Sequence, residues 1–312
     1  MARCFITRTL PGSSIERLSG AGHELDIWQE RMPPTTAELL SRTASAEGLL
    51  CMLTDSITAE LLDAATVLKV VSTMAVGCDN IDLIACSERG IHVGNTPGVL
   101  TDATADLTLA LILALARRIP EGITAVTSGD WKTWEPDFLL GMELRDRTLG
   151  IVGSGRIGSA VSARARAFGM NVIQSGRPDG PSPGVPLSDL LGQADVVSLH
   201  CPLTEATRGL VDAAFLATMQ THALLINTSR GQVVDQAALA SALTSGGIGG
   251  AALDVTDPEP LLPDDPLLAA PNLIVIPHLG SATTRTREAM SSIAVDNLLA
   301  GLEGSPLPHP VT

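Results

Sequence analysis

The chain has 312 residues, of which 45% are hydrophobic and 17% are charged, and its formal net charge is −14 at pH 7. This length exceeds the size at which one hydrophobic core keeps growing, so we expect two compact lobes. The acidic balance argues against nucleic acid and anionic membranes as partners, because both bind basic surfaces.

The chain also offers no segment for membrane insertion or export. Its densest apolar run, TLALILALA, is closed by Arg117 and Arg118 before it reaches the length of a membrane span. The N-terminus MARCFITRTL has no apolar core followed by a cleavage site. We therefore expect a cytoplasmic protein.

Short apolar runs alternate with helical patterns in the first third of the chain. Five of these runs have the length of a strand: RCFIT, ELDIW, GLLCML, LKVVS and IHVGN. Strands that alternate with helices are typical of a parallel sheet with crossover helices. The first lobe is therefore predicted to be an α/β lobe with a parallel sheet.

A long apolar segment, TDATADLTLALILALARRI, follows these strands. It is predicted to form one helix over Thr101–Ile119, capped by Thr101 or Asp102 and buried between lobes or subunits. This helix and the tryptophan-bearing segment GDWKTWEP exceed what one lobe needs to cover its core. Exposed apolar surface of this kind usually marks an interface, so we expect a homodimer.

A second series of strands begins at Thr148. It reads TLGIVG, MNVIQ, ADVVSLH, ALLINT, GGAALDV and NLIVIP, and each run is bounded by Gly, Pro or Asp. These runs predict a second α/β unit. After Ser281, apolar residues at helical spacing predict one amphipathic helix that ends around Gly301–Gly304.

The first strand of the second series ends in a glycine motif, GSGRIG. Gly153 would end the strand, Gly155 would let the backbone approach a phosphate, and Gly158 would let the next helix pack closely on the sheet. Free amides in the first turn of that helix, at Arg156 and Ile157, would bind a pyrophosphate. The motif predicts a dinucleotide site, and an ordinary glycine-rich turn is the alternative.

The next strand ends in QSGR, where sites that prefer NAD usually carry Asp or Glu. Here Gly176 stands between Ser175 and Arg177. A carboxylate would repel a 2′-phosphate, whereas glycine leaves room, serine can donate and arginine can pair with two oxygens. We expect NADP(H) to be preferred, with NAD(H) possible, although Asp179 weakens the local positive field. In the alternative, Arg177 stacks on adenine or faces solvent.

Three further segments carry reactive side chains, and each follows a predicted strand: NTSRG, ALDVTDPEP and PHLGSAT. The carboxyl ends of parallel strands line one crevice, so Arg230, Glu259 and His278 could converge there. Taken singly, each has a simpler interpretation, as a surface arginine, an acid in a loop and a core histidine. The scattered histidines and the absence of a CxxC or HxxxH pair predict no metal site.

Together with STMAVGCDNID and TPGVLTDATAD, these motifs resemble the D-isomer-specific 2-hydroxyacid dehydrogenase family over essentially the whole chain. The resemblance is greatest to its glyoxylate/hydroxypyruvate reductases, through segments such as GDWKTWEP and HLGSATTRTR. It implies two doubly wound parallel-sheet lobes. Residues 1–96 with 282–312 would form a flavodoxin-like substrate-binding domain, and residues 97–281 would form a Rossmann dinucleotide-binding domain.

The resemblance also implies roles for single residues. Arg230 would anchor the substrate, and Glu259 with His278 would form an acid/base pair. The substrate side would further include the amides of Val76 and Gly77, the side chain of Ser281, and Trp134 reaching from a neighbouring subunit. The cofactor would contact Thr104, Thr228, Asp254, His278 and Gly280. The glycine motif reads GSGRIG where many relatives have GLGRIG, and this change leaves its glycines intact.

The predicted reaction is the NADPH-dependent reduction of a small 2-keto acid, glyoxylate or hydroxypyruvate, to the D-2-hydroxy acid. Hydride addition to a keto acid generates alkoxide charge, so a proton donor is needed, and protonated His278 fits this role. Ionised Glu259 would favour the protonated ring and orient it. Arg230 would fix the carboxylate and polarise the carbonyl. The alternatives are a 2-ketogluconate-type, D-lactate-type or phosphite-oxidising enzyme, or a non-catalytic dinucleotide-sensing scaffold.

Overall fold

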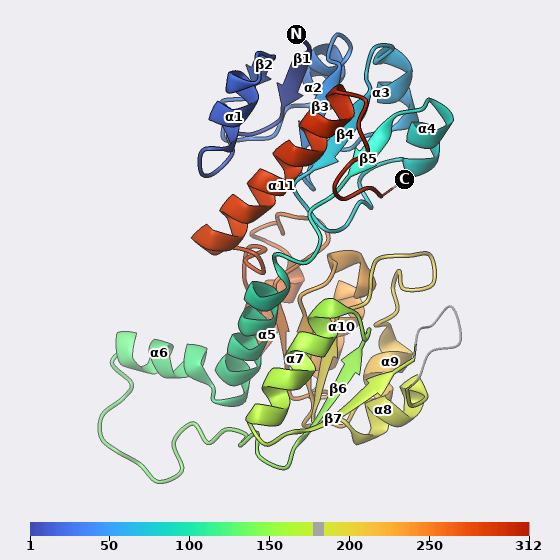
Figure 1. The fold of residues 1–312 in the computed structure, drawn as a ribbon. Coiled ribbons are helices and arrows are strands. Elements are labelled where there is room, and N and C mark those ends of the chain that lie inside the picture. Colours follow the sequence, from blue (N-terminus) through green and yellow to red (C-terminus); the bar gives the residue numbers. More distant parts are fainter. Residues whose placement is uncertain (177–183, 312) are drawn as a thin grey trace. The chain divides into compact units, whose positions relative to one another are not determined.

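The structure is a computed structural model that describes residues 1–176 and 184–311. The chain forms two compact units (Figure 1). Unit 1 consists of Met1–Leu100 and the chain from Ala282 onward, and unit 2 is Thr101–Ser281. Within the described residues, no helix combines the length and the apolarity that crossing a membrane requires.

Unit 1 is built on a five-stranded parallel sheet of order β2-β1-β3-β4-β5. Its strands are β1 (Arg3–Ile6), β2 (Glu24–Ile27), β3 (Gly48–Cys51), β4 (Val70–Thr73) and β5 (His92–Gly94). The helices are α1 (Ser14–Gly20), α2 (Thr36–Thr43), α3 (Ala59–Ala64), α4 (Leu83–Glu88) and α11 (Thr284–Leu302). Each strand lies where an apolar run predicts it.

Helices cover both faces of this sheet, so its central strands are buried on both sides. Successive side chains of a strand point to opposite faces. Thus Ile6 packs in the cluster that holds α11, whereas Phe5 packs in the cluster that holds α2 and α3. The C-terminal helix therefore completes the core of unit 1 from the far end of the chain.

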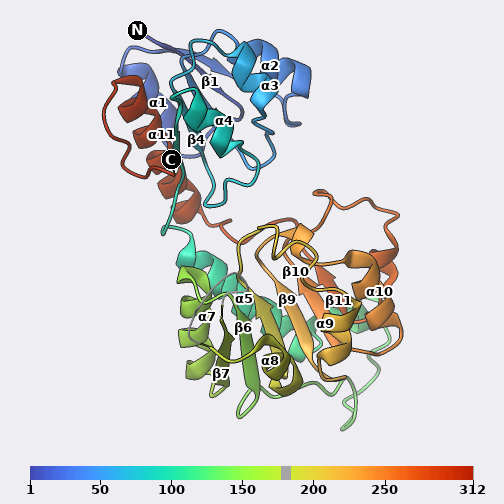
Figure 2. The ribbon, with the colours of Figure 1, turned by 90° about the vertical axis from the view of Figure 1, so that its right-hand side faces the viewer.

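Unit 2 is built on a six-stranded parallel sheet of order β11-β10-β9-β8-β6-β7 (Figure 2). Its strands are β6 (Thr148–Val152), β7 (Asn171–Ser175), β8 (Val196–Leu199), β9 (Leu224–Asn227), β10 (Gly250–Leu253) and β11 (Leu273–Val275). The strand order reverses at β6, and such a switch point is where doubly wound sheets bind ligands.

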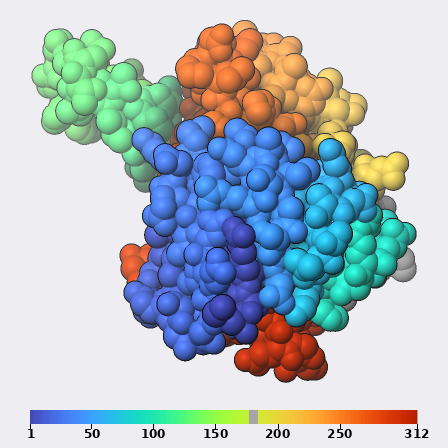
Figure 3. All heavy atoms as spheres, turned by 90° about the horizontal axis from the view of Figure 1, so that it is seen from above, coloured from blue at the N-terminus to red at the C-terminus, as the bar shows by residue number. Residues whose placement is uncertain are grey.

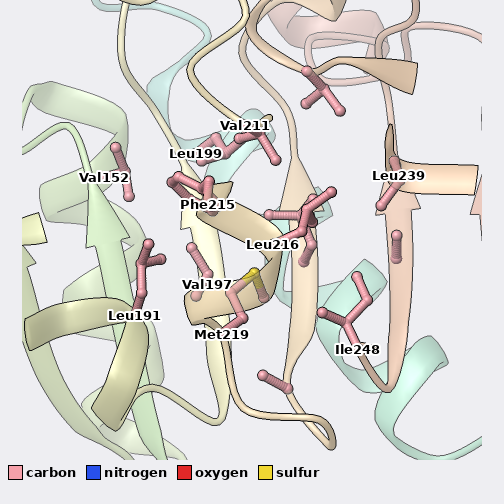
Figure 4. Close-up of a cluster of buried hydrophobic side chains, with 14 of the residues drawn as sticks. Val152, Leu191, Val197, Leu199, Val211, Phe215, Leu216, Met219, Leu239 and Ile248 are labelled. Carbon is pink, nitrogen blue, oxygen red and sulfur yellow. The ribbon is translucent and has the colours of Figure 1, made fainter. Parts of the chain in front are cut away.

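The two faces of this sheet carry different helices. One face holds α5 (Thr101–Ala116) and α7 (Arg156–Ala167), which lie side by side in Figures 1 and 2. The other face holds α8 (Leu187–Gln193), α9 (Ala213–Thr218) and α10 (Gln236–Thr244). Figure 4 shows this second core, where Phe215 and Leu216 of α9 pack over Val197 and Leu199 of β8.

The long helix predicted over Thr101–Ile119 is two helices. It begins at Thr101 itself, so neither Thr101 nor Asp102 caps it from outside, and it ends at Ala116. Arg118 then adopts a left-handed φ of 52°, and α6 (Ile119–Thr127) begins with Pro120 in its first turn. Pro120 has no amide to bond to the carbonyl of Ala116 and so cannot continue α5, and that carbonyl accepts from the amide of Met142 at 2.7 Å instead. α5 packs against the sheet of its own unit, and many of the exposed apolar residues lie on α6 and the segment after it.

Candidate active site

The reactive side chains of unit 2 follow three neighbouring strands. Because β9, β10 and β11 are adjacent and parallel, their carboxyl ends lie side by side at one edge of the sheet. Arg230 comes three residues after β9, Glu259 six residues after β10 and His278 three residues after β11. The topology of unit 2 therefore brings the three segments to one edge of the sheet, as expected.

Two of these segments touch through Gly231. A Cβ added there would lie 1.9 Å from the carbonyl oxygen of Thr256, so only glycine permits this approach. The half-buried Arg230 is held by the preceding turn, because the Nδ2 of fully buried Asn227 donates to its carbonyl at 2.8 Å. The Oδ1 of Asn227 accepts from the amide of Ser229 at 3.0 Å. These bonds fix the backbone at Arg230.

His278 and Glu259 form a bonded pair, with 2.9 Å between His278 Nδ1 and Glu259 Oε2. The second carboxylate oxygen, Oε1, accepts from the amide of Thr256 at 3.1 Å. Both side chains are about a quarter exposed, at 27% and 28%. Glu259 is thus held at both oxygens and fixes the imidazole through Nδ1, so Nε2 is the ring nitrogen that can meet a ligand.

The turn that carries His278 is held by Asp254, which is only 2% exposed. Its carboxylate accepts from the amides of Leu279 and Gly280, and its carbonyl accepts from the amide of His278 at 2.9 Å. Burial raises the pKa of the Asp254 carboxyl, and the two amides act against that rise. His278 itself adopts a left-handed φ of 52°, which this set of bonds supports.

A buried polar network surrounds the same turn. Thr104 Oγ1 donates to the carbonyl of Gly280 at 3.2 Å, and Thr108 Oγ1 lies 3.1 Å from Thr228 Oγ1. Thr108 also donates to the carbonyl of Thr104 at 2.8 Å. Four of the positions expected to contact the cofactor, namely Thr104, Thr228, Asp254 and Gly280, therefore lie within one connected region of unit 2.

The glycine motif has the geometry of a phosphate cradle. Gly153 has a left-handed φ of 101° and lies so close to the end of β8 that a Cβ would meet the backbone of His200 at 2.6 Å. A Cβ on Gly158 would lie 2.2 Å from the carbonyl oxygen of Gly153. Gly155, by contrast, faces open space, and α7 begins after it at Arg156 without a side-chain cap. Two glycines thus serve packing, and the third leaves room for a ligand over amides at the helix start.

The end of β7 carries the residues predicted to meet a 2′-phosphate. Ser175 is only 3% exposed, and its hydroxyl has no hydrogen-bond partner among the described residues. Gly184 lies close to this strand end, since a Cβ added to it would lie 2.5 Å from the amide nitrogen of Gly176. Arg177 lies outside the described residues.

The remaining candidates lie elsewhere. Val76 and Gly77 belong to unit 1, in the loop after β4, and Val76 is 36% exposed. Ser281 is buried at the last position of unit 2, and Trp134 is 79% exposed in the segment between α6 and β6. Asn227 was not among the predicted site residues. It is the last residue of β9 and precedes a turn, a position where asparagine side chains often bond to the nearby backbone.

Known proteins resemble the whole chain. The NAD binding domain of the D-isomer specific 2-hydroxyacid dehydrogenases matches residues 109–280. A glyoxylate reductase from Korarchaeum cryptofilum is 44% identical over 98% of this chain and 95% of the relative. The TT0316 protein from Thermus thermophilus has a crystal structure that superposes with a TM-score of 0.93, at 51% identity over 99% of this chain and 100% of that one.

A third comparison concerns a ligand complex. The NADPH-dependent glyoxylate/hydroxypyruvate reductase from Sinorhizobium meliloti, in complex with NADP and malonate, superposes with a TM-score of 0.83. It is 31% identical, and the match covers 100% of this chain and 97% of that one. The doubly wound sheet, the glycine cradle and these matches define an oxidoreductase that uses a nicotinamide dinucleotide. The chain belongs to the D-isomer specific 2-hydroxyacid dehydrogenases, as its motifs predict.

Proposed function

We propose that this enzyme uses NADPH to reduce glyoxylate to glycolate or hydroxypyruvate to D-glycerate, and that His278 is the proton donor. The observation that carries the proposal is the His278–Glu259 pair, held at 2.9 Å at the same sheet edge as Arg230. Relatives named for glyoxylate and hydroxypyruvate reduction support the choice of substrate.

The described contacts suggest how the proton is delivered. The bound nicotinamide supplies the hydride. His278 Nε2, opposite the nitrogen that Glu259 holds, gives its proton to the oxygen of the substrate carbonyl. Glu259 stabilises the protonated ring, and its bond from the Thr256 amide keeps it from turning away. Arg230 pairs with the substrate carboxylate and polarises the carbonyl.

The residues present fit a dinucleotide. The amides of Arg156 and Ile157 at the start of α7 would hold the pyrophosphate over the open face of Gly155. The network of Thr104, Thr228, Asp254 and Gly280 would hold the nicotinamide end, with its bonded groups already fixed by protein contacts. Gly176 and Arg177 would favour NADPH, because they place a space and a cation where other sites carry an acid.

Unit 1 would also contribute groups that bind the substrate. We assign the carboxylate to the amides of Val76 and Gly77, which lie in the loop at the carboxyl end of β4. Ser281 would contribute from the end of unit 2. The domain roles follow from this assignment: residues 1–96 with 282–312 bind the substrate, and residues 97–281 bind the cofactor.

The apolar face of α6 would pair two copies of the chain. Val126, Trp131 and Trp134 are 60%, 58% and 79% exposed, and a hollow of about 620 Å³ opens beside α6. In Figure 3 this green segment extends away from the orange and yellow parts of its own unit. An apolar patch of this kind usually marks an interface, and Trp134 would reach toward the partner's site. Sedimentation at micromolar concentration should show a dimer, and a monomer would contradict this proposal.

The substrate proposal is tested by steady-state kinetics of the wild-type enzyme. Glyoxylate, hydroxypyruvate, pyruvate and 2-ketogluconate are compared with NADPH and with NADH, and kcat/KM is measured for each pair. We expect the highest values with glyoxylate or hydroxypyruvate and NADPH. A higher value with pyruvate or 2-ketogluconate would reassign the substrate, and bound cofactor without turnover of any keto acid would favour the sensing scaffold.

A further inference from the structure

The direction of a backbone amide is set by the carbonyl of the same peptide unit. In a trans peptide the C=O and the following N–H are coplanar and point in opposite directions. A donor that binds the carbonyl of Val76 therefore directs the N–H of Gly77 the other way. A donor that binds the carbonyl of Ala75 does the same for the N–H of Val76.

Both carbonyls are bound in unit 1, and by neighbouring residues. The backbone amide of Thr96 donates to the carbonyl of Ala75 at 2.9 Å. The side-chain Nδ2 of Asn95 donates to the carbonyl of Val76 at 2.7 Å. Because Asn95 and Thr96 are consecutive and directly follow β5, both carbonyls point toward the end of β5. Both amides of the loop consequently point away from it.

These two amides are available to a ligand. Within the part of the chain that the structure describes, neither the Val76 amide nor the Gly77 amide donates a hydrogen bond to a protein group. Val76 is 36% exposed, so water reaches the loop. Consecutive backbone amides that point to one side form an anion-binding concavity.

The backbone of Asn95 is itself held by α11, the C-terminal helix. Fully buried Asn297 of α11 donates from Nδ2 to the carbonyl of Asn95 at 2.9 Å, and its Oδ1 accepts from the amide of His309 at 2.9 Å. The amide of Asn95 donates to the carbonyl of His309 at 3.2 Å. A Cβ on Gly94 would lie 2.7 Å from Asn297, so glycine at this position permits the contact.

We propose that Asn95 is a positioning residue that aims the Gly77 amide at the carboxylate of the substrate, supported by Asn297. The proposal rests on the proposed function, because it requires a keto acid bound at this loop. The Val76 amide is aimed by a backbone donor and is insensitive to side-chain replacement. Of the two donors, only the Asn95 side chain can be removed by substitution. Its loss should weaken binding of the substrate carboxylate and leave the side chains of unit 2 unchanged.

The test compares Asn95→Ala with Asn80→Ala. Asn80 lies in the same loop and donates from Nδ2 to the carbonyls of Met52 and Asp55 at 3.0 and 2.7 Å, away from the two aimed peptides. The readouts are kcat and KM for the keto acid, and the equilibrium binding of oxamate, a non-reacting analogue of a keto acid, to the enzyme with bound NADPH.

For Asn95→Ala we expect KM and the oxamate Kd to rise about tenfold, which corresponds to one hydrogen bond to a charged group, with kcat within about twofold and NADPH affinity unchanged. Asn80→Ala should leave oxamate binding near the wild-type value. If Asn95→Ala does not fold, Asn95→Ser removes the same donor with a polar side chain.

Unchanged oxamate binding in the Asn95 variant would overturn the proposal, as would an equal loss in both variants, which indicates general loosening of the loop. Wild-type enzyme that binds NADPH but neither turns over a keto acid nor binds oxamate would instead overturn the proposed function, and the positioning role with it.

Discussion

The two units place different chemical groups at the same structural position. In both, loops at the carboxyl ends of parallel strands carry the proposed site. In unit 2 the groups are side chains, namely Arg230, Glu259 and His278, whereas in unit 1 they are the backbone amides of Val76 and Gly77. In the proposed mechanism, the charged side chains would therefore come from unit 2, and unit 1 would contribute uncharged backbone donors.

This difference determines which groups can be identified from the residue types in the sequence and which can be removed by a substitution. A side-chain site needs particular residue types, so replacing one residue removes the group. A backbone site tolerates many side chains and depends on whatever holds the neighbouring carbonyls, which here are Asn95 and Thr96. We therefore expect changes in unit 2 to act mainly on the chemical step and changes in unit 1 to act on substrate binding.

The largest effect should come from His278→Ala. Losing a general acid typically lowers turnover by roughly 10²- to 10⁴-fold, and NADPH affinity should be largely kept because the turn is held by Asp254. Rapid-mixing measurement of NADPH oxidation gives the rate, and His92→Ala, an exposed histidine of unit 1, is the control. Near-normal turnover in His278→Ala would remove the assignment.

Arg230→Ala should weaken keto-acid use by orders of magnitude, because a bidentate charged contact is worth a few kcal/mol. Arg230→Lys should restore little, since an ammonium group cannot reproduce the planar fork. The measurement is kcat/KM for the keto acid at saturating NADPH. Full activity of the lysine variant would show that two-point recognition by Arg230 is wrong.

The preference for NADPH over NADH should depend on the residues at the end of β7. One charged, partly exposed contact is worth roughly 1–3 kcal/mol, so we expect a preference for NADPH of about 5- to 150-fold that falls as salt is raised. Gly176→Asp should invert it, because the carboxylate repels the 2′-phosphate and accepts from the ribose hydroxyls of NADH. The ratio of kcat/KM for the two cofactors measures this. A ratio untouched by both Gly176→Asp and Arg177→Ala would contradict it.

A second histidine at the same sheet edge should affect stability instead of catalysis. Burial lowers the pKa of His200 to about 4, and Ser198 Oγ lies 2.9 Å from its Nε2. The unfolded chain binds this proton near the ordinary pKa of 6.5, so the folded state loses stability as pH falls from about 6.5 toward 4.

Between pH 7 and pH 5 this linkage amounts to roughly 2 kcal/mol. Urea unfolding gives the free energy of unfolding at pH 7 and at pH 5. The decrease between these pH values should be smaller in His200→Gln than in wild-type protein, by roughly 2 kcal/mol. The two proteins would lose stability in parallel if His200 were protonated in the folded state.

Strand positions and the side-chain site could be predicted from the sequence because their signals are local. The runs that form β3, β4 and β8 are rich in Val and Leu with few polar residues, and these strands are buried at every position. Arg230, Glu259 and His278 follow β9, β10 and β11 within three to six residues. Parallel topology then brings them to one edge without further information.

The remaining features depend on contacts between distant segments. The need for glycine at position 231 comes from the carbonyl of Thr256, and the role of Asn95 comes from the loop after β4 and from α11. The break between α5 and α6 is marked locally by Pro120, but it also involves the left-handed backbone of Arg118, a conformation that arginine rarely adopts.

The most direct test of the account is the product formed from hydroxypyruvate. If the proton of His278 and the hydride of the nicotinamide are delivered to a keto acid whose carboxylate is held in one orientation, hydride should reach a single face of its C2 carbonyl. Chiral chromatography of the glycerate produced by wild-type enzyme with NADPH should then show the D isomer alone. L-glycerate, a mixture of isomers, or bound NADPH without glycerate would contradict the account.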